Sequence, residues 1–132
     1  MSIHPKYAAA IFEGRKTVEL RRRPFPDSVR IVVVYATAPL GSILGTVEVT
    51  AVRRLSPVTA WRGYGHRAAI EIDAFNEYFA GVEQASVIEL RNSVQFAVPV
   101  RLADLRADLR APMSWRYLSV RDVELLSRIT RR

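Results

Sequence analysis

Short runs of alternating apolar and polar residues dominate this chain, and proline, glycine and serine separate the runs. Alternation with a period of two predicts half-buried strands, whereas apolar residues three and four apart predict helices. By these signals we expect strands over residues 17–22, 31–36, 43–53, 86–91 and 94–100. We expect helices over residues 5–12 and 72–80, others starting at residues 57 and 120, and one helical turn within 102–110. Because strands and helices do not alternate between residues 17 and 53, the pattern favours an α+β fold with a curled mixed sheet over a doubly wound parallel sheet.

Residues at the predicted helix ends support these boundaries. Pro5 and Pro57 stand where the first turn of a helix accepts proline, and Ser56 is a suitable N-terminal cap. Gly14 and Gly81 follow apolar runs and fit the left-handed conformation that ends many helices.

Three finer expectations concern strand faces and turns. Residues 31–36 are nearly all apolar, which is typical of a strand covered on both faces. Asn92-Ser93 is a suitable hairpin turn between two strands, and Pro99 places the second of them at a sheet edge. For the last helix, a capped start over residues 119–122 predicts an inward stripe formed by Val123, Leu126 and Ile129.

The least ordinary segment is residues 14–21, in which charged residues follow directly on the helix-ending glycine. On the predicted strand, Thr17, Glu19 and Arg21 share one face, and Lys16 lies just before it. A carboxylate between cations can hydrogen-bond the edge of a base and hold a phosphate at the same time. The alternative is an ordinary surface ion pair, which contributes less than ~1 kcal/mol to stability.

This octet resembles the G-x-K-x-x-E-x-R pattern of the ASCH family, a branch of the PUA-like superfamily. The four fixed positions are filled by Gly14, Lys16, Glu19 and Arg21. The segments 31–36, 45–49 and 114–118 also resemble small bacterial ASCH proteins in their arrangement, so the resemblance spans most of the chain. Only the octet is specific.

The resemblance implies a small pseudo-barrel with peripheral helices and a basic cleft. Family members bind RNA or modified nucleobases, and a few are hydrolases. Members that remove an acetyl group from modified cytidine carry threonine three residues after the lysine, where this chain has Glu19. This difference counts against that activity, although Lys16 with Glu19 or Glu89 retains the means to activate water. The simpler interpretation of Glu89 is a half-buried carboxylate paired with Arg91.

The predicted ligand-binding residues extend beyond the octet. Lys16, Glu19 and Arg21 are placed in the cleft, and Arg23 is one of three consecutive arginines available at its mouth. Trp115 and Tyr117 are candidates for stacking on a base, whereas Trp61 is interpreted as a core residue.

Composition narrows the range of partners. The net charge is +7, from 20 basic and 13 acidic residues, and 18 of the basic residues are arginines. An excess of guanidinium groups favours a polyanionic partner over a merely solvated surface. We therefore expect RNA, another single-stranded nucleic acid or a modified nucleoside as ligand.

Other classes of function lack the residues they need. Cysteine is absent and only two histidines occur, so neither thiolate chemistry nor a zinc site is expected, and we expect no cofactor. Neither a secretory signal nor a membrane span is visible, which predicts a cytoplasmic protein. We expect one domain over residues 1–132, with a frayed basic tail at the end.

Two main functional hypotheses follow. The first is a nucleic-acid or modified-nucleobase binding module built around Lys16, Glu19 and Arg21. The second is a small metal-independent hydrolase, of nucleoside amidohydrolase or ribonuclease type, in which Lys16 and Glu19 are catalytic. A protein-interaction adaptor is a weaker third hypothesis.

Overall fold

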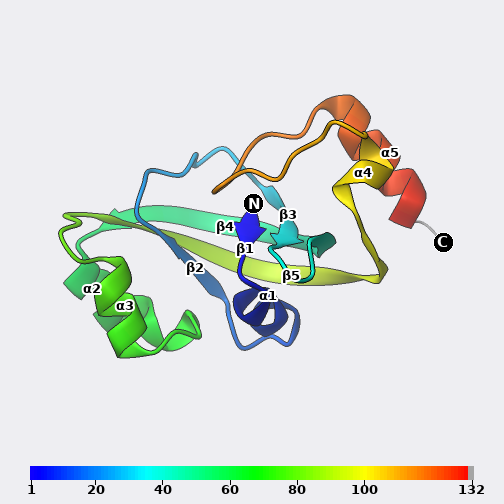
Figure 1. The fold of residues 1–132 in the computed structure, drawn as a ribbon. Helices are drawn as coiled ribbons and strands as arrows, with labels where there is room; N and C mark the ends of the chain where they lie inside the picture. Colours follow the sequence, from blue (N-terminus) through cyan, green and yellow to red (C-terminus); the bar gives the residue numbers. More distant parts are fainter. Residues whose placement is uncertain (131–132) are drawn as a thin grey trace.

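The structure is a computed structural model that describes residues 1–130 (Figure 1). Its strands are β1 (Ser2–Ile3), β2 (Val18–Arg21), β3 (Ile31–Ala36), β4 (Ser42–Leu55) and β5 (Ala85–Val100). Its helices are α1 (Pro5–Phe12), α2 (Pro57–Tyr64), the short 3-10 helix η1 (Gly65–Arg67), α3 (Ile72–Tyr78), α4 (Leu102–Leu105) and α5 (Val120–Thr130).

The five strands form one mixed sheet in the order β1-β3-β4-β5-β2. Strand β1 runs parallel to β3, and all other neighbouring pairs are antiparallel. The two edge strands are joined by a side chain, because Nη2 of Arg21 on β2 donates to the carbonyl oxygen of Ser2 on β1 at 2.9 Å. The predicted α+β fold with a curled mixed sheet and peripheral helices is therefore confirmed.

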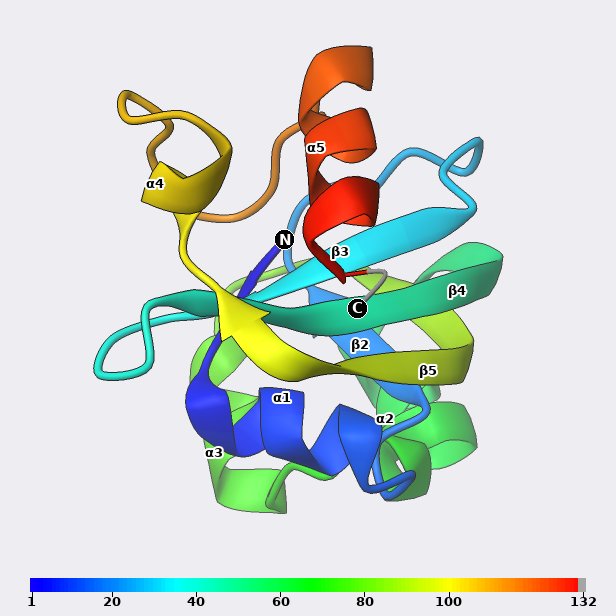
Figure 2. The ribbon, with the colours of Figure 1, turned by 90° about the vertical axis from the view of Figure 1, so that its right-hand side faces the viewer.

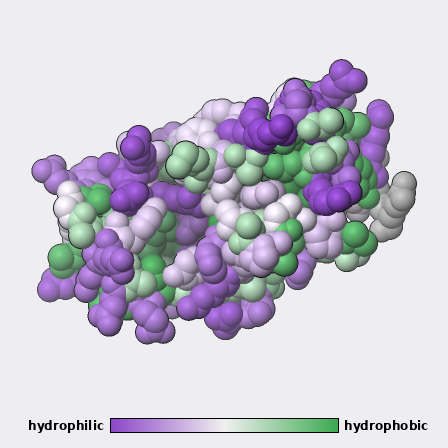
Figure 3. Space-filling view, in the orientation of Figure 1, coloured by the Kyte–Doolittle hydropathy of each residue, from purple (hydrophilic) through white to green (hydrophobic). Residues whose placement is uncertain are grey.

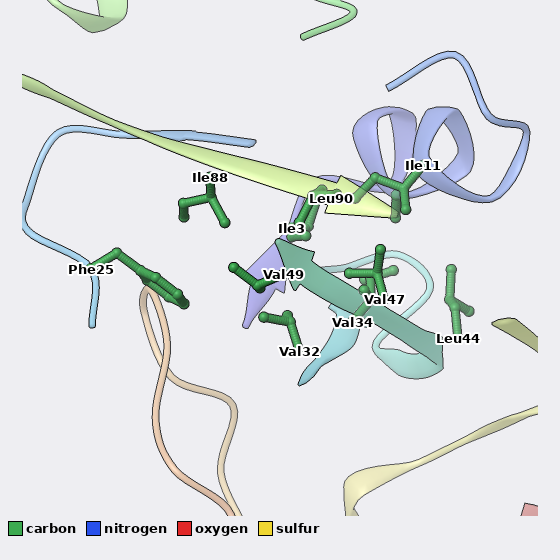
Figure 4. Packing of buried hydrophobic residues seen from close by; sticks show 12 residues of the cluster. Ile3, Ile11, Phe25, Val32, Val34, Leu44, Val47, Val49, Ile88 and Leu90 are labelled. Atoms are coloured by element: carbon green, nitrogen blue, oxygen red, sulfur yellow. The ribbon is translucent and has the colours of Figure 1, made fainter. Parts of the chain in front are cut away.

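Helices cover the sheet from two sides. Figures 1 and 2 show α1, α2 and α3 below the sheet and α4 and α5 above it. The main core, shown in Figure 4, packs α1 against β1, β3, β4 and β5, with Ile11, Val34 and Ile88 at most 2% exposed. A second core lies between β2, β5 and the α2–α3 region, and a third lies beneath α4 and α5.

The predicted helix ends are confirmed by the local hydrogen bonds. Gly14 has a φ of +81°, and Ser56 Oγ accepts from the backbone N–H of Thr59 at 3.2 Å. At the start of α5, the backbone N–H of Asp122 donates to Ser119 Oγ, and the Asp122 carboxylate accepts from the Ser119 backbone N–H. This reciprocal pair satisfies two backbone donors that a helix start leaves free.

The predicted hairpin at Asn92-Ser93 is wrong, because β5 continues through it as one strand paired with β4. Thr46 pairs with Val94 and Glu48 with Arg91, so β5 holds one more residue than β4 between these pairs. Asn92 adopts a φ of +51° and absorbs the extra residue as a bulge. The left-handed asparagine that suits a turn therefore bends a long strand here.

Two further expectations need correction. Strand β3 is not evenly covered on both faces, because Val32 and Val34 are buried while Ile31 on the opposite face is 54% exposed. Val123 is 48% exposed, so the buried side of α5 is formed by Asp122 and Leu126 instead of the full predicted stripe.

The basic tail, predicted to be frayed, covers residues 128–132. Its first three residues belong to α5, which ends at Thr130, and residues 131–132 lie outside the described residues.

Candidate functional site in the seam between the edge strands

A cleft of about 330 Å³ lies where β1 and β2, the two edges of the curled sheet, approach each other. We call it the seam cleft. Its polar and aromatic lining consists of Ser2, His4, Tyr7, Lys16, Glu19, Arg21 and Tyr78. These residues come from β1, the start of α1, the octet and α3, so the curling of the sheet assembles the cleft from distant parts of the sequence.

The turn after α1 sets the position of Lys16. Gly14 turns the chain in the left-handed region, and the backbone N–H groups of Arg15 and Lys16 both donate to the Ala10 carbonyl at 3.0 Å. The next N–H, that of Thr17, donates to the Arg67 carbonyl at 2.8 Å. The backbone on both sides of the Lys16 side chain is thus fixed before β2 begins.

The Lys16 ammonium is buried and held by two oxygen atoms. The residue is only 4% exposed, Nζ donates to the Ala68 carbonyl at 2.6 Å, and Nζ lies 3.4 Å from Glu19 Oε1. It also lies 5.1 Å from the centre of the Tyr7 ring, within reach of a cation–π interaction. Burial of an ammonium without such partners would cost several kcal/mol.

Both carboxylate oxygens of Glu19 are engaged. Oε1 accepts from the Leu20 backbone N–H at 3.1 Å, in addition to facing Lys16, and Oε2 accepts from Arg21 Nη2 at 3.1 Å. Burial alone would raise the pKa of the Glu19 carboxyl, but the Lys16 and Arg21 cations hold it below its ordinary value of 4.5. Glu19 is therefore an anion at neutral pH and a weak base.

Arg21 ties the cleft to the C-terminal part of the chain. Besides Glu19 and the Ser2 carbonyl, its guanidinium reaches Ser114 Oγ, with Nη1 donating at 3.3 Å. Its Nε is buried and has no hydrogen-bond partner, which is true of no other buried side-chain nitrogen or oxygen within residues 1–130. Arg21 thus links β1, β2 and the segment before α5.

The structure separates the other predicted ligand-binding residues from this cleft. The Arg23 side chain is exposed and does not line the cleft, whereas the neighbouring Arg22 stacks 5.1 Å from the ring centre of Tyr78. Trp115 and Tyr117 line a different cavity. Of the six predicted ligand-binding residues, Lys16, Glu19 and Arg21 lie together in the seam cleft, whereas Arg23, Trp115 and Tyr117 do not line it.

Glu89 has partners other than the predicted Arg91. Its carboxylate accepts from Arg67 Nη1 at 3.0 Å and from Arg53 Nε at 3.2 Å, while Arg91 pairs with Glu48. Burial would raise the pKa of Glu89, but Arg67 and Arg53 hold it below its ordinary value. Arg67 also donates from Nε to Thr17 Oγ1 at 3.0 Å, so this network braces the loop whose carbonyls hold Lys16 and Thr17.

Sequence reasoning missed the aromatic and imidazole lining of the cleft. Tyr7 and Tyr78 come from α1 and α3, and His4, which was not among the predicted site residues, caps α1 and lines the same cleft. Helical spacing gave no sign that α3 packs beside the octet. The one signal in the sequence was the position of Tyr7, seven residues before Gly14. This spacing is about two helical turns and places Tyr7 on the side of α1 from which the octet begins.

Comparison with known proteins supports this assignment of the fold. The family model for the ASCH domain matches residues 1–95. The chain is 33% identical over 134 residues to an ASCH domain-containing ribonuclease of Zymomonas mobilis, covering 98% of this chain and 90% of that protein. The crystal structure of ASCH from Zymomonas mobilis superposes with a TM-score of 0.92 at 32% identity, covering 98% of this chain and 93% of that one.

A crystal structure of a Zymomonas mobilis variant, in which a tyrosine is replaced by phenylalanine, has the same TM-score of 0.92 at 31% identity. It covers 98% of this chain and 96% of the other. This chain therefore belongs to the ASCH domain family, a branch of the PUA-like superfamily.

Among residues 1–130, no group of three or more histidine, aspartate or glutamate side chains is arranged to hold a metal ion. In the same part of the chain, no helix is long and apolar enough to cross a membrane.

The charge state of Glu19 predicts how the fold responds to acid. Because its pKa is lowered in the folded state, the ionised carboxylate contributes stability above its unfolded value of about 4.5, and this contribution is lost as pH falls further. We expect the urea midpoint of the Glu19→Gln variant to fall less steeply than that of the wild type between pH 6 and pH 3. Glu83→Gln, at an exposed position, is the matched control and should retain the wild-type slope. Equal slopes for wild type and Glu19→Gln would contradict the assignment.

Proposed function

We propose that this protein is a ribonuclease that cleaves single-stranded RNA in the seam cleft, with Lys16 and Arg21 as the cations that contact the reacting phosphate. The observation that carries the proposal is the buried Lys16 ammonium, held on the wall of an open cleft by Ala68 and Glu19. Similarity over nearly the whole chain to an ASCH ribonuclease supports this hypothesis over the binding module. The net charge of +7 is consistent with a polyanionic substrate.

In the proposed reaction the 2′-oxygen of a ribose attacks the adjacent phosphorus, and the bond from phosphorus to the 5′-oxygen breaks. The 2′-hydroxyl loses its proton and the 5′-oxygen gains one, which leaves a 2′,3′-cyclic phosphate and a free 5′-hydroxyl. Negative charge increases on the phosphate oxygens as the attacking oxygen bonds to phosphorus. Fixed cations that face this charge lower the barrier, because they need no reorganisation during the reaction.

The seam cleft offers weak bases only. Glu19 is held as an anion by two cations, which makes it a poor proton acceptor. His4 Nδ1 accepts from the backbone N–H of Lys6 at 3.1 Å, so in the neutral ring the proton is on Nε2. His4 is therefore suited to donate a hydrogen bond to a phosphate oxygen. We propose that the 2′-hydroxyl proton leaves to solvent, so that the rate of cleavage rises with pH through the neutral range.

The test is cleavage of a labelled single-stranded RNA and of DNA of the same sequence, in the presence of EDTA. We expect the RNA to be cut to products with cyclic phosphate ends and the DNA to remain intact, since DNA has no 2′-hydroxyl. Lys16→Gln protein purified in parallel controls for contaminating nucleases. Equal cleavage of DNA, or cleavage that EDTA abolishes, would overturn the proposed chemistry. RNA binding without cleavage would favour the binding module.

A further inference from the structure

A second, larger cavity of about 550 Å³ adjoins the seam cleft, since Met1 lines this cavity and the next residue, Ser2, lines the seam cleft. We call it the outer cavity. Residues of β3, β4 and α5 and several residues between 109 and 118 form most of its lining. Most of its lining is apolar, and Ile31, Tyr117 and Val123 remain between 48% and 63% exposed at it. In Figure 3, hydrophobic surface gathers at the end of the molecule where α5 lies.

An aromatic pair stands at this cavity. The rings of Trp115 and Tyr117 meet edge to face with centres 5.2 Å apart, and Trp115 in turn packs 5.6 Å from Phe25. Trp115 is anchored against the main core, whereas Tyr117 is 63% exposed. An anchored indole with an exposed phenol beside it provides a rigid ring surface on which a base can stack at low entropic cost.

The charge around the cavity is one-sided. Arg110 and Arg116 line it, and in the described part of the lining there is no acidic side chain. Neither arginine takes part in the ion pairs found within residues 1–130. An apolar cavity whose lining includes two arginines and no carboxylate complements a ligand that combines a flat ring with a phosphate.

The outer cavity and the seam cleft share a wall. Met1 lines the first and Ser2 the second, and the Ser2 backbone N–H donates to the Ser114 carbonyl at 2.8 Å. Arg21 of the seam cleft reaches Ser114 Oγ at 3.3 Å, and Trp115 follows directly in the chain. The aromatic pair therefore begins one residue after Ser114, which the seam-cleft residues Ser2 and Arg21 both contact.

We propose that the outer cavity is a base-stacking subsite for the same RNA strand, in which Tyr117 and Trp115 receive a base that flanks the nucleotide in the seam cleft and Arg116 contacts its phosphate. This inference rests on RNA as the substrate of the proposed function, but it does not require cleavage. It keeps the predicted stacking role of Trp115 and Tyr117 and assigns it to a cavity separate from the seam cleft.

The first test measures the affinity of a fluorescein-labelled single-stranded RNA hexamer in the Lys16→Met background, where cleavage does not interfere. Loss of one stacked base is worth about 1–3 kcal/mol, so Tyr117→Ala should weaken binding roughly 5- to 150-fold. Tyr117→Phe keeps the ring and should bind within about twofold of its parent. Val120→Ala, at a 77% exposed position near the cavity but outside its lining, is the matched control. Unchanged affinity in Tyr117→Ala would overturn the proposal.

A second measurement reports on the cavity itself. In a Trp61→Phe background Trp115 is the remaining tryptophan, and we expect the hexamer to quench its fluorescence. Decanoate, an apolar anion, tests the competing occupant; quenching by decanoate and not by RNA would overturn the proposal. If the protein fails to cleave RNA while Tyr117→Ala still weakens binding, the proposed ribonuclease function fails and this subsite stands. If RNA is cleaved and Tyr117→Ala binds normally, the reverse holds.

Discussion

Replacement of Lys16 by methionine is expected to lower kcat/KM for RNA cleavage by at least about 100-fold, the usual cost of removing one group that faces developing charge. Methionine retains an unbranched apolar stem of similar length, so the space beside Tyr7 stays filled. The charge that Nζ places between the Ala68 carbonyl and Glu19 is lost. Initial rates on a labelled single-stranded RNA, with substrate below and above KM, measure the effect.

Stability must be separated from catalysis in this experiment, because removal of one partner from a buried ion pair is destabilising. In Lys16→Met the Glu19 carboxylate keeps its bonds from Arg21 and from the Leu20 N–H, which limits the loss. The double variant Lys16→Met/Glu19→Gln also leaves the Arg21 guanidinium without its carboxylate partner, so it is expected to melt below Lys16→Met and to remain as inactive. A folded Lys16→Met protein that cleaves RNA at the wild-type rate would refute the placement of the site.

Local signals in the sequence were sufficient for the elements that hold the octet. Pro5 and Gly14 mark the ends of α1, and the period of two in residues 17–22 marks β2, because caps and strand alternation depend on neighbouring residues only. The ion pairs of Glu19 with Lys16 and Arg21 also lie within the octet. The charged centre of the candidate site was therefore predictable.

The rest of the site depends on how the sheet curls, which local signals do not contain. Arg21 reaches Ser2 and Ser114, and Lys16 is held by Ala68, all of which are at least 19 residues away along the chain. The same curling directs the segment that carries Trp115 to the far side of the wall. The sequence therefore predicted the cleft around Lys16, Glu19 and Arg21 but gave no sign of the second cavity, which Trp115 and Tyr117 line.

The missed continuity of β5 has a related cause. Asn92 readily adopts a positive φ, and that conformation serves a hairpin turn and a bulge equally well. What decides between them is the partner strand, since β4 is long enough to pair with residues on both sides of Asn92. The partner is 44 residues away at Glu48, which Asn92 itself contacts through its side-chain amide.

The closest approach of β4 to its surroundings yields the largest stability effect that we predict. A Cβ added at Gly45 would lie 2.1 Å from the Val94 carbonyl oxygen and 2.8 Å from the Phe12 ring. The first of these neighbours is backbone in the paired strand β5, and the second packs against the main core. Neither can move without opening the β4–β5 pairing or the contact with α1.

Gly45→Ala is therefore expected to lower the free energy of unfolding by about 3 kcal/mol, at the upper end of the range for overpacked cores. Urea denaturation followed by circular dichroism measures the change. Gly63→Ala is the matched control, because a Cβ at Gly63 meets nothing within 4 Å and Gly63 lies inside helix α2. Alanine there should raise stability by about 0.5–1 kcal/mol through helix propensity. If Gly45→Ala unfolds at the wild-type urea concentration, that result would contradict the close approach of the β4 backbone to Val94 and Phe12.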